Sequence, residues 1–162
     1  MTHAADEPRW AGGPHKPPPG RPDGGGGPWG LGFLALVPIP FLAQIGAGVW
    51  MGAAGAEQRK QGGVAGEQGR RAGNWGYTYA AFCGVILVFV LAVIAGMETS
   101  SAFAQEWVWL LPLATAVLGL LTLLHLLVCG AGLVAAVGGR VLECPALPFL
   151  KSEPQPTQGE LT

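Results

Sequence analysis

His125 is the residue of this sequence best placed to do chemistry, because it lies near the middle of a long apolar run. A titratable side chain at such a position could relay protons, or it could form part of a metal site with Cys129, four residues later. Two ligands without a second histidine or a carboxylate in any apolar run make a poor metal site, and no chain of polar groups marks a proton path. We therefore favour a neutral, hydrogen-bonded His125 and predict no catalytic, cofactor-binding or metal-binding residue.

Gln44 is a second polar side chain near the middle of an apolar run. Because an amide at this depth needs a hydrogen-bond partner, we predict that Gln44 and His125 face each other or share a water. His125 also belongs to a stripe of residues that recur on one face of a helix, and this stripe should face protein rather than lipid. The stripe comprises Thr115, Thr122, His125, Cys129, Gly132 and Ala136.

The elements that hold these residues are expected to be membrane helices. The chain has 162 residues, of which 50% are hydrophobic and 12% are charged, whereas about 25% of residues are charged in an average soluble domain. Three apolar runs, at about 31–56, 77–97 and 110–137, are close to or longer than the roughly 20 residues that cross a bilayer. The fold class is therefore predicted to be all-α, with three transmembrane helices in a membrane domain at 29–151. The net charge of -1 argues against binding to nucleic acid.

Two prolines interrupt the first of these runs. Pro38 and Pro40 each remove a backbone donor, and each ring clashes with the carbonyl four residues back, so a kink is expected. We favour one bent helix that crosses the membrane. The alternative is that this segment is re-entrant or splits into two half-helices and returns to its starting face. Further along the run, Gly48 and Gly52 form a GxxxG pattern that lets another backbone approach closely, most simply within the monomer.

The connection at 57–76 sets the expected orientation. It contains six of the eight charges found between Gly30 and Gly139, whereas the connection at 98–106 has no Lys or Arg. By the positive-inside rule the first connection should be cytoplasmic, with its basic side chains at anionic headgroups. These side chains are Arg59, Lys60, Arg70 and Arg71. At the end of the connection, Asn74 is expected to cap the start of the second helix.

Both ends of the chain are polar and are predicted to be disordered. Residues 1–28 are rich in Pro and Gly, and residues 152–162 have few apolar side chains. The N-terminal tail lacks the apolar core of a signal peptide. With one bent first helix, this tail lies outside the cell, and Trp29 joins Trp107 and Trp109 at the outer membrane interface. With a re-entrant first segment, the tail lies inside instead.

Two short stretches are similar to a known family. In one, Gly138-Gly139 leads through Cys144, where the family usually has tyrosine, to Pro148-Phe149. In the other, Gly48-Val49-Trp50 precedes the charged connection and Arg71-Ala72-Gly73-Asn74-Trp75 follows it. Both stretches resemble small bacterial integral membrane proteins of unknown function, distantly related to the chloroplast import component called Tic-twenty. The resemblance covers roughly residues 30–151 and implies an α-helical domain in a bacterial plasma membrane, with no assigned activity.

The sequence lacks the motifs of common enzymes. P-loop, HExxH, CxxC and GxSxG patterns are all missing, and no pair of carboxylates lies in the apolar runs. We therefore expect a non-enzymatic plasma-membrane protein without a cofactor, acting as an interaction or scaffold component. Its expected partners are the lipid bilayer and a membrane protein or copies of itself. The alternative is a subunit of an oligomeric transport or translocation pore, in which His125, Thr122 and Gln44 line a polar path.

Overall fold

The computed structural model describes residues 25–151, and this part of the chain is helical without any strand. The expected all-α class is confirmed. Most of the two predicted disordered tails, at 1–24 and 152–162, lies outside the described residues. In chain order the elements are α1 (Gly27–Leu31), the 3-10 helix η1 (Gly32–Leu36), α2 (Leu42–Arg59), α3 (Gly63–Thr99), α4 (Ser101–Trp107) and α5 (Leu110–Val137).

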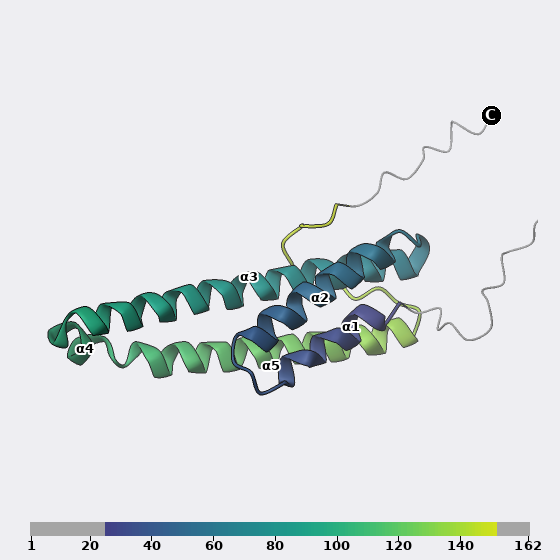
Figure 1. Ribbon diagram of the computed structural model, residues 1–162. Coiled ribbons are helices and arrows are strands. Elements are labelled where there is room, and N and C mark those ends of the chain that lie inside the picture. Colours follow the sequence, from purple (N-terminus) through teal and green to yellow (C-terminus); the bar gives the residue numbers. More distant parts are fainter. Residues whose placement is uncertain (1–24, 152–162) are drawn as a thin grey trace, which may run out of the picture.

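The two longest helices, α3 and α5, run antiparallel and are joined at one end by the short α4 (Figure 1). By length and composition both could cross a membrane, whereas the apolar stretch Gly27–Leu36 is shorter. Ser100 separates α3 from α4 because its backbone is extended, with φ -151° and ψ 122°. Its hydroxyl then accepts a hydrogen bond from the Phe103 amide at 3.3 Å, which caps the start of α4. The reversal between the long helices is therefore encoded locally.

The first apolar run is two helices, so the prediction of one bent span is wrong. Val37 is extended, with φ -62° and ψ 128°, as is usual for a residue before proline. Phe41 then adopts a positive φ of 62°. Two prolines so close together end the helix instead of bending it. The chain reverses at this point, so that α1 and η1 lie antiparallel beside α2 (Figure 1). The alternative of two half-helices thus describes this segment.

Glycines bring α2 and α3 into close contact. A Cβ added at Gly48 would lie 2.6 Å from the Gly76 carbonyl oxygen, and one added at Gly55 would lie 2.4 Å from the Gly69 carbonyl oxygen. At Gly52 the added atom would meet the ring of Tyr77 at 2.4 Å. The GxxxG pair therefore packs within the monomer, and the absence of side chains is what allows these backbones to approach.

The charged connection is mostly helical, which corrects the predicted loop at 57–76. The α2 helix continues to Arg59 and α3 already begins at Gly63, so only residues 60–62 form a turn. Gly62 has a positive φ of 68°, which suits glycine. Glu67 forms ion pairs with Arg70 and Arg71, three and four residues later, and such pairs stabilise a helix.

Burial divides the molecule into a packed half and an exposed half. The packed half contains two clusters of buried apolar side chains where α1, η1 and α2 meet α3 and α5, and the second cluster extends to Leu118 in the exposed half. We call the exposed half the distal arms and define it as residues 84–99 of α3 and 110–121 of α5. In the distal arms only Val93, Ala114 and Leu118 are buried. Their many exposed large side chains are apolar, as expected for a surface in contact with lipid.

Candidate functional site

His125 is fully buried at the centre of the packed half, and both of its ring nitrogens have partners. The Trp75 indole Nε1 donates a hydrogen bond to Nδ1 at 3.1 Å, and Nε2 lies 3.2 Å from the Gly32 carbonyl oxygen. The Tyr79 ring stacks on the imidazole with 3.7 Å between centroids. Because an indole N–H can only donate, Nδ1 must be unprotonated, and a neutral imidazole then donates its Nε2 proton to Gly32. This arrangement suits a structural histidine.

Hydrogen bonds extend this cluster along the contact between α3 and α5. The Tyr79 hydroxyl lies 3.1 Å from the Thr122 hydroxyl, which also donates to the Leu118 carbonyl at 2.8 Å. The Cys129 sulfur lies 3.5 Å from His125 Nε2. Thr122, His125 and Cys129 of the predicted stripe therefore face protein. Thr115 does not, because it lies in a distal arm where it is exposed and bonds only to the Leu111 carbonyl of its own helix.

Gln44 and His125 are not joined by a hydrogen bond. The reversal after η1 brings the Gly32 carbonyl to His125, and α3 supplies the indole of Trp75, so both imidazole nitrogens are occupied. Within residues 25–151, Gln44 Oε1 is buried without a hydrogen-bond partner. The sequence contained a signal for the true partner, since Trp75 lies at the start of an apolar run, but such tryptophans are expected at an interface with lipid headgroups.

Trp29 occupies a different place from the one predicted. It is fully buried, and its indole Nε1 donates to Gln68 Oε1 at 3.0 Å. Its ring fills the space above Gly132, where an added Cβ would lie 2.2 Å away. The first apolar run reverses, so α1, which contains Trp29, packs beside the C-terminal half of α5, whereas α4, which ends at Trp107, lies beyond the other end of α5 (Figure 1). Gln68 was missed by sequence reasoning because it stands among charged residues, which are typical of a solvated loop.

We call residues 140–151 the C-terminal strap, and polar side chains of α3 hold its backbone. Asn74 Oδ1 accepts a hydrogen bond from the Leu150 amide at 2.5 Å, and its Nδ2 donates to the Leu150 carbonyl at 3.3 Å. Thr78 Oγ1 accepts from the Leu147 amide at 2.9 Å, and Gln68 Nε2 donates to the Arg140 carbonyl. The predicted helix cap at Asn74 is wrong, because α3 already begins at Gly63.

The basic residues gather at the end of the molecule where the strap joins α3. Arg59 donates to the Lys151 carbonyl at 2.7 Å, which joins the end of α2 to the end of the strap. This end contains all six basic residues of the described chain and three acidic ones, while Glu98 and Glu106 lie at the α4 end. The basic residues are Arg59, Lys60, Arg70, Arg71, Arg140 and Lys151.

Glu67 is the main acidic partner of these residues. Its carboxylate accepts hydrogen bonds from Arg70 at 2.6 and 2.7 Å and from Arg71 at 2.8 Å. The hydrogen bond from Arg70, followed by that from Arg71, lowers the pKa of Glu67 from 4.5 to about 2 although partial burial opposes this shift. The same hydrogen bond raises the pKa of Arg70. The group is therefore ionised over the whole physiological range.

This shift predicts a pH dependence of stability. The folded-state pKa of Glu67 is below its ordinary value, so its stabilising contribution is complete above pH 4.5 and is lost as the pH falls through about 2. Thermal unfolding in detergent at neutral pH and at about pH 3 should show a smaller acid-induced loss of Tm for Glu67→Gln than for the wild type. Glu106→Gln is the control, since Glu106 makes no ion pair within the described residues. Equal losses in all three proteins would contradict the prediction.

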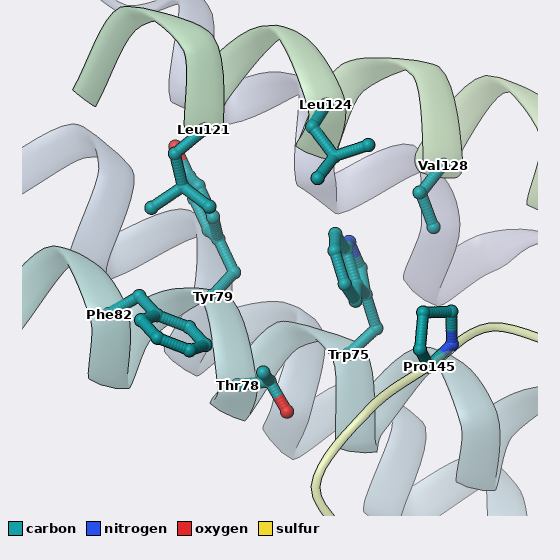
Figure 2. Close-up of a pocket in the computed structure, with 8 residues that line it drawn as sticks. All are labelled: Trp75, Thr78, Tyr79, Phe82, Leu121, Leu124, Val128 and Pro145. Atoms are coloured by element: carbon teal, nitrogen blue, oxygen red, sulfur yellow. The ribbon is translucent and has the colours of Figure 1, made fainter. Parts of the chain in front are cut away.

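Two cavities lie on either side of the C-terminal strap. An apolar groove of about 390 Å³ runs between α3 and α5 and is closed at one end by Pro145 of the strap (Figure 2). A polar cavity of about 180 Å³ is lined by Arg70, Arg71 and strap residues that include Cys144. Burial raises the pKa of Cys144, although the nearby Arg71 opposes this. These cavities are the strongest candidates for ligand sites.

Within residues 25–151, no group of three or more His, Cys, Asp or Glu side chains lies together in a way that could hold a metal ion. The chain matches none of the protein-family models, curated proteins or solved structures with which it was compared.

Proposed function

We propose that this chain is a non-enzymatic integral protein of a bacterial plasma membrane, and that its distal arms bind a transmembrane helix of a partner. The observation that carries this proposal is the contrast between the packed half and the distal arms. Helices in lipid associate through close packing of their surfaces, because lipid tails are as apolar as the side chains themselves. The arms bury only three side chains within the molecule, so most of their surface is available for such packing.

Small residues on the arms favour a helical partner. A Cβ added at Gly84 or Gly119 would meet no atom within 4 Å, so both positions are open to the approach of another backbone. Glycines at the α2–α3 contact serve the same purpose inside the molecule. The second candidate, a pore subunit, is less well supported, because His125 and Thr122 make hydrogen bonds inside the monomer instead of presenting their polar atoms to a path.

The charge distribution favours one orientation. All six basic residues of the described chain lie at one end, and by the positive-inside rule this end belongs in the cytoplasm. A cysteine introduced at Gln61, in the turn after α2, should react with an impermeant thiol reagent only after the cells are opened. A cysteine introduced at Gln105 of α4 should react in intact cells. The reverse pattern would contradict this orientation.

Photo-cross-linking in native membranes tests the proposed interaction. A photoreactive residue at Val88 or Leu120, which are 67% and 69% exposed, should yield one product of defined mass in which a second polypeptide is attached. Gly84→Leu combined with Gly119→Leu should abolish that product, because the added side chains block close helix approach. Gly130→Leu is the matched control, since Gly130 is equally open but lies outside the arms. Cross-links to lipid alone, or a product unaffected by the double substitution, would contradict the interaction.

A further inference from the structure

The apolar groove between α3 and α5 presents no free polar group to a ligand. Apart from aromatic residues, Thr78 is the one residue with a polar side chain in the lining of the groove. Its hydroxyl already donates to the Asn74 carbonyl and accepts from the Leu147 amide. The polar atoms of Trp75 and Tyr79 are likewise engaged by His125 and Thr122. A ligand portion that fills this groove must therefore be hydrocarbon, because a polar group there would lose its hydrogen bonds to water.

The walls of the groove are held in place by contacts within the protein. Figure 2 shows Leu121, Leu124 and Val128 of α5 facing Trp75 and Tyr79 of α3 across the groove. The hydrogen bonds on the far side of both aromatic rings hold them in place. An apolar pocket of this size is typical of a small-molecule site.

The closed end of the groove lies next to the polar cavity. Pro145 lines the groove, while its neighbours Cys144 and Ala146 line the polar cavity. Because these three residues are consecutive, the two cavities adjoin each other at the strap. They are adjacent on α3 as well, because Asn74 lines one cavity and Trp75 lines the other.

The polar cavity has the charge of an anion site. Arg70 and Arg71 both contribute to its wall, and Glu67 compensates only one of these two positive charges. The other acidic neighbour, Glu143, lies 3.9 Å from Arg71 and is 88% exposed, which makes it a weak partner. Guanidinium groups bind phosphate oxygens well, since their paired N–H donors match the geometry of the anion.

We propose that these two cavities form one site for an anionic phospholipid, with one acyl chain in the apolar groove and the phosphate at Arg70 and Arg71. This inference rests on the proposed membrane location, which supplies such a molecule beside the groove. The strap residue Pro145 lies between the two parts of the lipid, so the headgroup passes over the strap at the membrane interface. The arginines recognise the negative charge of the headgroup, and the groove binds the hydrocarbon of the acyl chain.

Native mass spectrometry of the full chain from nanodiscs tests this site. The discs contain equal amounts of phosphatidylglycerol and phosphatidylcholine with identical acyl chains. The wild type should retain one phosphatidylglycerol in preference to phosphatidylcholine. Leu124→Trp should fill the groove and abolish retention of both lipids, and Arg71→Gln should lower the preference for the anionic lipid about fivefold while chain binding persists. Leu127→Trp is the control, because Leu127 is 63% exposed, lies outside the distal arms and does not line the groove.

Several outcomes would overturn the inference. Equal retention of the two lipids by the wild type, or unchanged retention in both Leu124→Trp and Arg71→Gln, would exclude a specific anionic site. Far-ultraviolet circular dichroism of each variant shows whether it has folded, and Arg71→Gln remains decisive if the tryptophan variant has not. A wild-type chain that fails to enter nanodiscs would overturn both the membrane location and the lipid site. Loss of selectivity in a chain that does insert would overturn the lipid site alone.

Discussion

Gly55→Ala will lower the free energy of unfolding by about 3 kcal/mol, because the added methyl group has no space between α2 and α3. A Cβ at this position would lie 2.4 Å from the Gly69 carbonyl oxygen and 2.6 Å from the Gly73 amide nitrogen. Both atoms are backbone, so no side-chain rotation can relieve the clash and the two helices must separate. Equilibrium unfolding of the purified protein in mixed micelles measures this loss.

Gly46→Ala in the same helix is the matched control, and its expected effect has the opposite sign. A Cβ at Gly46 would meet no atom within 4 Å. Alanine is favoured over glycine in a helix by about 0.5–1 kcal/mol, so this variant should be slightly more stable than the wild type. If Gly55→Ala and Gly46→Ala had the same effect, the close contact between α2 and α3 would not exist as described.

His125→Leu will also destabilise the fold by about 3 kcal/mol, because it leaves two buried polar groups without partners. The Trp75 indole Nε1 now donates to His125, and the Gly32 carbonyl oxygen lies 3.2 Å from the second imidazole nitrogen. Neither group can reach water in the packed half, since the histidine that they contact is fully buried. Unfolding in mixed micelles again provides the measurement.

A double-mutant cycle separates these hydrogen bonds from simple packing. In a Trp75→Phe background the indole donor is already absent, so His125→Leu should cost about 1–2 kcal/mol less than it does in the wild type. Thr115→Val serves as the control because Thr115 is exposed and bonds only within its own helix. Its effect should stay within about 0.5 kcal/mol. Additive costs for Trp75 and His125 would show that the hydrogen bond between them does not stabilise the fold.

Charge and composition alone did not reveal the role of the Glu57–Trp75 stretch. Its six charged residues and several glycines are typical of a solvated loop, yet most of the stretch is helical. Gly66, Gly69 and Gly73 face α2, where they permit close approach, and Glu67 pairs with two arginines along α3. In a sequence, a glycine suggests a flexible backbone. Whether it instead allows two helices to pack closely depends on which residues lie next to it in space. Asn74 is a similar case. It was expected to cap a helix, but it holds the strap through Leu150, a residue distant in sequence.

The sequence by itself determined the two long apolar helices and the gathering of basic residues beside them. An apolar run must be long enough to cross the bilayer, and its backbone must satisfy every hydrogen bond in an apolar solvent. Both requirements depend only on the local sequence. Periodicity also placed Thr122, His125 and Cys129 on a face toward protein. Only the tertiary structure decided that the chain reverses at Pro38 and Pro40. That reversal gives His125 the Gly32 carbonyl in place of Gln44, because which distant segments meet depends on the packing of the whole molecule.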